Sequence, residues 1–182
     1  MAVETRSQAL VEGMVIPTLE TDRLRLCAFR NDHLDAYASF CADPEVMRYL
    51  GTGVTQNRGE AWRAMASMLG HWELRGYGMW AVERKDGGEL VGRAGFINPE
   101  GWPGFELGWV LGRPHWGNGY AIEAARVALR YGRETLGRDR VISLIRQGNE
   151  RSVKVALALG SRLTGETELL GSRALVYEWR AP

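Results

Sequence analysis

The sequence WGNGYA occupies residues 116–121, and a run of helix-forming residues, 122–136, follows it at once. Gly117, Gly119 and Ala121 carry little or no side chain, so a ligand can approach the backbone closely here. The first N–H groups of a helix lack intrahelical partners, and the helix dipole adds partial positive charge at that end. The sequence therefore predicts an anion site at this turn, best matched by the phosphate of a cofactor.

Two common phosphate-binding motifs do not fit this stretch. Ile122 stands where the third glycine of the dinucleotide-binding pattern would be. The Gly-Lys-Ser/Thr ending of the nucleotide-hydrolase loop is also absent. Because Gly-x-Gly sequences are frequent in turns, the segment could equally be an ordinary turn before a helix.

Composition limits the class of protein. The chain has 182 residues, which suits one domain with a full hydrophobic core. A net charge of +1 gives no reason to expect nucleic acid as a partner. Cys27 and Cys41 lack metal-ligand spacing, so we expect no metal site. We find neither a signal-peptide core nor a run of about 20 apolar residues, and expect a cytoplasmic protein without membrane contact.

The hydrophobic pattern predicts a mixed α/β order of elements in one domain. Residues 1–18 show no clear period and are expected to form an N-terminal extension, and the domain covers residues 19–182. Strands are expected at residues 24–28, 79–84, 90–97, 105–111, 141–145, 162–170 and 174–180. Helices are expected at residues 32–41, 46–50, 60–74 and 122–136, with a last helix between Asn149 and Gly160.

Side-chain spacing assigns faces to two of these elements. In the helix over residues 60–74, Trp62, Met65, Leu69 and Trp72 fall on one side and are expected to pack in the core. In the strand over residues 105–111, Glu106 shares a face with Gly108 and Val110, opposite the aromatic and leucine side chains.

Four segments, in this order, resemble the GNAT superfamily of N-acetyltransferases, and most closely its RimJ/RimL-type subgroup. They are LETDRLRL at residues 19–26, ELGW at 106–109, PHWGNGYAIEA at 114–124 and NERS at 149–152. The resemblance spans residues 19–179. It implies a single-domain GNAT fold: a central mixed, mostly antiparallel sheet of about seven strands flanked by helices. The fourth strand (105–111) and the fifth (141–145) would splay apart.

The resemblance also implies acetyl-CoA as cofactor. Its pyrophosphate would lie on the N–H groups of the glycine stretch, and its pantetheine arm would run beside the splayed strand. Asn149 would contact the pantetheine or its water network. The implied cofactor residues are Trp109, Val110, Leu111, Trp116, Gly117, Asn118, Gly119, Tyr120, Ala121, Asn149 and Ser152.

The chain departs from the family pattern at two positions. Trp116 stands where Arg or Gln usually begins the glycine motif, although an aromatic residue is frequent there in this subgroup. Ala156 stands where many members carry a tyrosine that protonates the leaving thiolate, and Ser152, one turn earlier, is the candidate replacement.

Acetyl transfer requires a neutral amine, a donor for the oxyanion and a proton for the thiolate. Glu106 is the candidate base, acting directly or through one water, although a strand glutamate can also be a solvated edge residue. A backbone N–H near Val110 is the expected oxyanion donor. Ser152 is either the acid or a first-turn serine that satisfies backbone groups.

The acceptor is the least determined part of the hypothesis. We expect a primary amine, either a small molecule or the N-terminus of a peptide such as a ribosomal protein. Tyr49, Trp80 and Glu168 are the candidate acceptor residues. The alternative to an enzyme is a module that senses acyl-CoA without transferring the acyl group, as the missing tyrosine at Ala156 would allow. The protein is expected to be a monomer or a homodimer.

Overall fold

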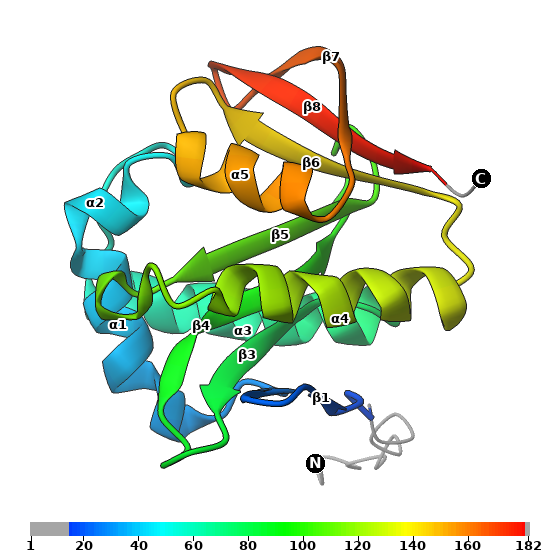
Figure 1. Cartoon of the computed structure of the whole chain (residues 1–182). Helices are drawn as coiled ribbons and strands as arrows, with labels where there is room; N and C mark the ends of the chain where they lie inside the picture. Colours follow the sequence, from blue (N-terminus) through cyan, green and yellow to red (C-terminus); the bar gives the residue numbers. More distant parts are fainter. Residues whose placement is uncertain (1–14, 181–182) are drawn as a thin grey trace, which may run out of the picture.

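The computed structural model describes residues 15–180, and they form one eight-stranded sheet flanked by helices (Figure 1). The strands lie in the order β1-β2-β3-β4-β5-β6-β8-β7. In this part of the chain β5 pairs with β6 in parallel, and the other strand pairs are antiparallel. The bounds are β1 Leu19–Glu20, β2 Leu24–Cys27, β3 Met79–Arg84, β4 Leu90–Ile97, β5 Glu106–Leu111, β6 Arg140–Arg146, β7 Arg162–Leu169 and β8 Ser172–Arg180.

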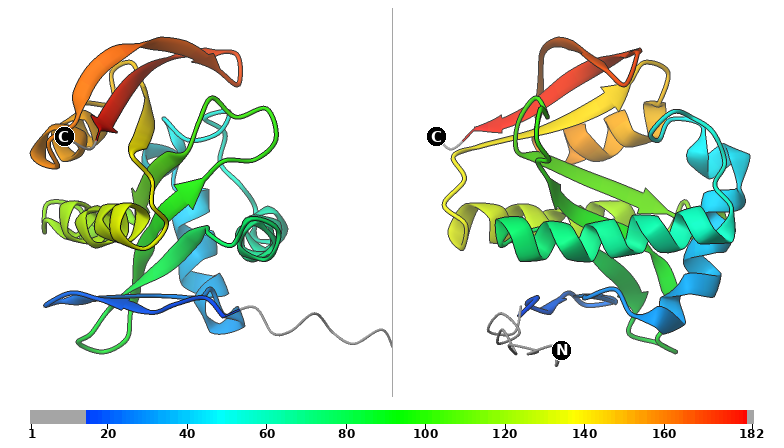
Figure 2. Two further views of the ribbon diagram at one scale, coloured as in Figure 1. Left: turned by 90° about the vertical axis from the view of Figure 1, so that its right-hand side faces the viewer. Right: turned by 180° about the vertical axis from the view of Figure 1, so that it is seen from behind.

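Residues 15–180 include five α-helices, and helices lie on both faces of the sheet (Figure 2). The α4 and α5 helices pack on one face, where the small side chains Ala124, Ala125 and Ala128 allow α4 to approach closely. The α1 and α3 helices pack on the other face. The bounds are α1 Leu34–Ala42, α2 Pro44–Met47, α3 Arg58–Arg75, α4 Tyr120–Glu134 and α5 Glu150–Ala158, with short 3₁₀ turns at Asn31–His33 and Arg113–His115.

The predicted fold class is confirmed, with differences at the element ends. An added two-residue strand, β1, brings the count from about seven to eight. The α3 helix begins two residues earlier than predicted, because Asn57 and Glu60 cap each other's backbone N–H groups. Its predicted apolar face is partly wrong: Trp62 is 52% exposed, and the buried positions are Ala61, Met65, Met68 and Trp72.

The predicted splay between the two central strands is present and has a side-chain cause. The strands β5 and β6 register only at Glu106 and Ile142, where the Ile142 N–H donates to the Phe105 carbonyl at 3.0 Å. In a regular parallel ladder the Leu144 N–H would donate next to the Leu107 carbonyl. Here the Glu106 carboxylate accepts from Leu144, and the Ser143 hydroxyl donates to Leu107. The strands therefore separate after this point.

The part of the predicted extension that is described, residues 15–18, reaches the domain. The Trp80 indole donates a 2.7 Å hydrogen bond to the Pro17 carbonyl, and Ile16 packs against the core. The rest of the predicted extension lies outside the described residues. Within residues 15–180, none of the helices has the length and apolar character needed to traverse a bilayer.

Candidate active site

The glycine stretch forms an open turn at the start of α4. Gly117 and Gly119 have φ angles of 81° and 79°, a region that side-chain-bearing residues rarely adopt. Gly119 is the N-cap of α4, and no side chain caps the first amides of that helix. A Cβ at Gly117 would meet nothing within 4 Å. The turn is therefore open at Gly117 and leaves the start of α4 without a side-chain cap, as an anion site requires.

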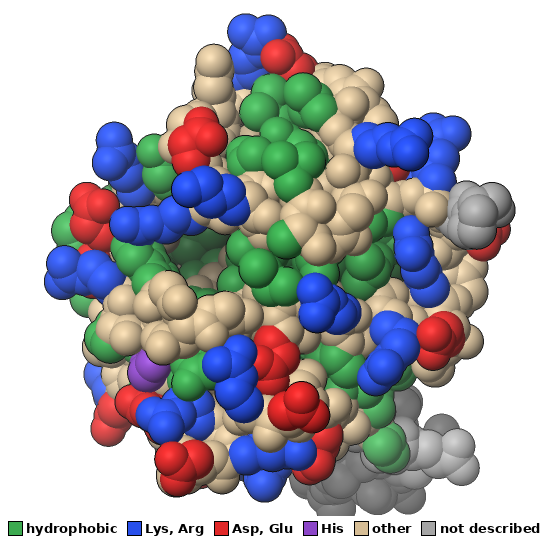
Figure 3. Space-filling view, viewed as in Figure 1, with side chains coloured by type: hydrophobic (Ala, Val, Ile, Leu, Met, Phe, Trp, Pro, Cys, Tyr) green, Lys and Arg blue, Asp and Glu red, His purple; other side chains and the backbone are tan. Residues whose placement is uncertain are grey.

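This turn forms one wall of a cavity of about 820 Å³. Figure 3 shows the hollow beside α2, α5 and the start of α4, with Lys and Arg side chains at its rim. Most predicted cofactor residues line it: Trp109, Val110, Leu111, Trp116, Gly117, Gly119, Tyr120, Ala121, Asn149 and Ser152. Asn118 is not among the lining residues; its side-chain amide donates to the carbonyls of His115 and Trp116, which supports the turn from behind.

Arg151 and Lys154 form a cationic wall of the cavity beside Trp116, and it was not predicted from the sequence. The Trp116 indole N–H donates to the Leu111 carbonyl at 2.9 Å, which fixes the ring between β5 and the glycine turn. The Arg151 guanidinium lies 4.0 Å from the centre of that ring. Lys154, one turn further along α5, also lines the cavity. The sequence could have indicated this positive charge, because Arg151 lies two residues after Asn149 and therefore in the first turn of the helix that Asn149 caps.

The start of α5 forms the opposite wall. The Asn149 side-chain oxygen accepts from the Ser152 N–H at 3.3 Å, so this asparagine caps the helix. Among the described residues, none forms a hydrogen bond with the Ser152 hydroxyl. Ala156, which replaces the usual tyrosine, is fully buried against the core.

Glu106 lies at the fork of β5 and β6 with only 8% of its surface exposed. Trp102 donates to one carboxylate oxygen, Oε2, at 2.6 Å, and the Leu144 N–H donates to the other, Oε1, at 3.2 Å. Burial raises the pKa of Glu106 to about 7, although these two hydrogen bonds and the nearby Arg93 charge act to lower it. A carboxyl with a pKa near neutrality can exchange protons at physiological pH.

Glu106 does not itself line the cavity. Trp109, three residues further along β5, does line it, which separates the two positions by about 10 Å along the strand. The fork therefore places a buried carboxyl at its closed end and the cavity at its open end. An approaching ligand has to enter between β5 and β6 to contact both.

The backbone of β5 presents its free groups on alternate residues. Gly112 donates to the Val91 carbonyl in the ladder with β4, and Arg93 pairs with Val110. By the alternation of an antiparallel ladder, the Val110 N–H also points toward β4. The amides of Trp109 and Leu111 point toward the open edge instead. The predicted oxyanion donor near Val110 therefore narrows to the amides of Trp109 and Leu111, and it stays a prediction.

The structure separates the three predicted acceptor residues. Tyr49 lines the cavity together with Leu50. Trp80 was a wrong prediction: it is 0% exposed, and it packs among Trp72, Phe96 and Tyr131 in the core. Glu168 lies exposed on β7 and is not among the residues that line the cavity, so its acceptor role stays a prediction.

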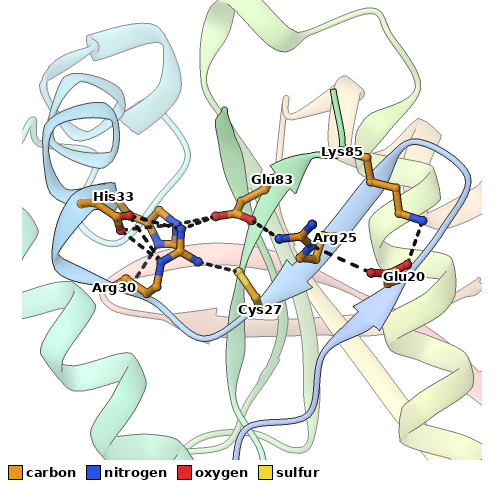
Figure 4. A network of polar contacts seen from close by, with 8 residues as sticks. Glu20, Arg25, Cys27, Arg30, His33, Glu83 and Lys85 are labelled. Carbon is orange, nitrogen blue, oxygen red and sulfur yellow. Dashed lines mark hydrogen bonds and ion pairs between the residues drawn. The ribbon is translucent and has the colours of Figure 1, made fainter. Parts of the chain in front are cut away.

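A second polar cluster joins β2, β3 and the turn before α1 (Figure 4). Cys27, His33 and Glu83 are buried with potential ligand atoms within 4.8 Å of one another. However, the Arg30 guanidinium donates to Glu83 at 2.7 Å and lies 3.5 Å from the Cys27 sulfur. The Arg30 N–H donates to His33 Nδ1 at 3.1 Å, so His33 Nε2 carries the proton that Glu83 accepts at 2.8 Å.

This arrangement favours an ion-pair network over a metal site. A metal would have to displace both the proton on His33 Nε2 and the Arg30 cation. Burial alone would raise the pKa of Glu83, but the hydrogen bonds from His33 and Arg30 outweigh it and hold the pKa below its ordinary value. The network therefore contributes to stability near neutral pH.

Comparison with known proteins gives a consistent assignment. Residues 23–162 match the family model described as the Acetyltransferase (GNAT) domain. The uncharacterized protein YkkB of Bacillus subtilis is 33% identical over 168 residues, covering 88% of this chain and 94% of YkkB. The uncharacterized N-acetyltransferase p20 of Bacillus licheniformis is 30% identical, covering 81% of this chain and 84% of p20.

Solved structures show the same likeness. The acetyltransferase of Agrobacterium tumefaciens strain C58 superposes with a TM-score of 0.82 at 30% identity, covering 92% of this chain and 96% of that one. RimL, a ribosomal L7/L12 alpha-N-protein acetyltransferase solved with coenzyme A, has a TM-score of 0.74 at 18% identity. That comparison covers 90% of this chain and 98% of RimL, and it shows a shared fold alone.

Proposed function

The chain belongs to the RimJ/RimL-type GNAT N-acetyltransferases, which use acetyl-CoA, and from this premise we propose that a primary amine attacks directly in a ternary complex. Glu106 is the proposed base. The observation that carries the proposal is its place at the fork: a buried carboxyl with a pKa of about 7 stands where β5 separates from β6. The cavity lies along the same strand, beyond the fork.

The residues that line the cavity suit the chemistry of the cofactor. The uncapped start of α4 at Gly119 and the open backbone at Gly117 suit a pyrophosphate, and Arg151 and Lys154 add positive charge on the facing helix. The open edge of β5 suits the amide groups of a pantetheine arm. Acetyl-CoA supplies the activated acyl group when bound. The proposed tasks of the chain are to hold it, to orient the amine and to move a proton.

The proton is proposed to move to Glu106. A primary alkyl amine is mostly protonated at neutral pH, so a group that accepts its proton is needed before it can attack. Either oxygen of Glu106 can take that proton, directly or through one water, because each hydrogen bond occupies only one lone pair. The amides of Trp109 and Leu111 are the proposed donors to the developing oxyanion. Ser152, with its unoccupied hydroxyl in the cavity wall, is the proposed partner of the thiolate.

The acceptor is proposed to enter beside Tyr49 and Leu50, which reach the cavity from the segment that follows α2. Small amines and peptide N-termini both remain candidates. RimL acts on a ribosomal protein N-terminus, so such peptides belong in the acceptor panel. The sensor alternative rests on the missing tyrosine at Ala156, and it is not favoured because Ser152 places a hydroxyl in the cavity wall instead.

Two measurements test this function. Calorimetric titration should show acetyl-CoA binding at micromolar concentration, and no binding at millimolar concentration would exclude the assigned cavity. A thiol-release assay across N-terminal peptides, polyamines and amino acids should then show turnover on at least one acceptor class. If the protein binds acetyl-CoA but turns over no acceptor class, the result favours the acyl-CoA sensor over the enzyme.

A further inference from the structure

Trp102 belongs to the loop between β4 and β5, residues 98–105, and it makes the shortest contact to Glu106. Its backbone N–H donates to the Pro99 carbonyl at 3.0 Å, which closes a turn in this loop. Its ring packs against Ile142 and Leu144 of β6 and Ala174 of β8. The indole N–H is thereby held 2.6 Å from Oε2 of Glu106.

We propose that Trp102 is a positioning residue that orients Glu106 and stabilises its charged form in the acetyl-transfer reaction. The proposal rests on the proposed role of Glu106 as base. Each oxygen of the Glu106 carboxylate accepts one N–H, Oε2 from Trp102 and Oε1 from Leu144, so its rotation is fixed. The Leu144 donor is backbone, so Trp102 is the donor that a substitution can remove.

The groups around Glu106 determine the direction in which loss of the Trp102 hydrogen bond would shift its pKa. An indole nitrogen donates but cannot accept, so it favours the carboxylate over the carboxylic acid. The Glu106 side chain is almost fully buried, and little solvent is available to replace a lost donor. Arg93, from β4, is the nearby cation whose charge acts in the same direction. Loss of the Trp102 donor should therefore leave Glu106 protonated over a wider pH range.

Trp102→Phe removes the donor and keeps an aromatic ring in the same packing position. The titration midpoint of the Glu106 carboxyl is measured directly by carbon-13 NMR of that carboxyl, in the protein without acceptor. We expect the midpoint to rise by about one to two pH units. The acid limb of the pH profile of kcat/KM should move to higher pH by the same amount. Trp62→Phe, on the exposed face of α3, is the matched control and should change neither.

The outcomes separate this proposal from the proposed function. An unshifted Glu106 midpoint in Trp102→Phe overturns the positioning role, and so does a shifted midpoint with an unmoved acid limb. If Glu106→Gln keeps the wild-type kcat, the base assignment is what fails. Should Trp102→Phe not fold, the wild-type indole N–H signal decides: it should titrate with the Glu106 carboxyl and lose that titration in Glu106→Gln. An indole signal that does not titrate overturns the proposal.

Discussion

The Glu106 carboxylate accepts the Leu144 N–H at 3.2 Å, a donor that a regular parallel ladder would give to the carbonyl of Leu107. One side chain thus interrupts the pairing of β5 with β6 and lies at the point where they part. The same residue that opens the fork is the proposed base. The fold and the chemistry are therefore coupled at a single position of β5.

The glycine turn can be tested by adding side chains. Gly117→Val should raise the Kd for acetyl-CoA tenfold or more, because its Cβ branches would occupy the space in which the phosphates are expected and strain a backbone at φ 81°. Gly137→Val is the matched control: it also has a positive φ, 61°, with nothing within 4 Å, but it lies beyond the far end of α4. Calorimetry on both variants decides. Equal affinities would place the phosphates elsewhere.

Arg151 should contribute charge to cofactor binding. Arg151→Gln is expected to weaken acetyl-CoA binding by about tenfold at low salt, since a charge-assisted contact to phosphate is worth about 1–2 kcal/mol. Binding of acetyl-pantetheine, which lacks the nucleotide phosphates, should not change. Arg126→Gln, exposed on α4 and outside the cavity, serves as control. A loss of affinity that is equal for both ligands would contradict a phosphate role.

The network around Glu83 should stabilise the fold without affecting the site. Glu83→Gln leaves Arg30 and His33 without their shared carboxylate, and we expect a loss of about 2–4 kcal/mol in the free energy of unfolding, measured in urea. Glu20→Gln, at the exposed end of the same network, should leave the free energy of unfolding nearly unchanged, because solvent screens this ion pair. A weaker effect at Glu83 than at Glu20 would contradict the network's role.

The pH dependence of this stability has a definite sign. The pKa of Glu83 is lowered in the folded protein, so its contribution is complete above the unfolded value near 4.5 and is lost as the pH falls through the folded value. Wild-type protein should therefore lose stability below about pH 4.5 more steeply than Glu83→Gln. Parallel stability curves in that window would show that Glu83 titrates alike in both states.

The sequence predicted correctly the strands and turns whose ends are marked by glycines or by apolar runs. The strands at residues 79–84 and 90–97 match β3 and β4, because a Gly-Gly turn and a clear apolar run define their ends. The glycine turn before α4 was predictable for the same reason. Trp80 was misassigned because an aromatic residue in a strand gives the same sequence pattern whether its side chain faces a cleft or the core.

Long-range partners were beyond single-sequence reasoning. Trp102 lies only four residues from Glu106, yet the bond between their side chains depends on how the loop folds onto β6 and β8. The stacking of Arg151 on Trp116 joins two helix starts that are 35 positions apart in the chain. The pairing of Leu144 with Glu106 follows from strand register, which periodicity does not encode.

The central claim is that Glu106 accepts the amine proton while the cavity holds acetyl-CoA, and the pH–rate profile of Glu106→Gln tests it most directly. Wild-type kcat/KM should rise through an acid limb near pH 7, where the Glu106 carboxyl loses its proton. Glu106→Gln should lose that limb and lower kcat by about 10²- to 10⁴-fold at neutral pH, with an unchanged Kd for acetyl-CoA. Glu134→Gln, at the exposed end of α4, should behave as wild type. A Glu106→Gln enzyme that keeps the wild-type profile and kcat would contradict the account.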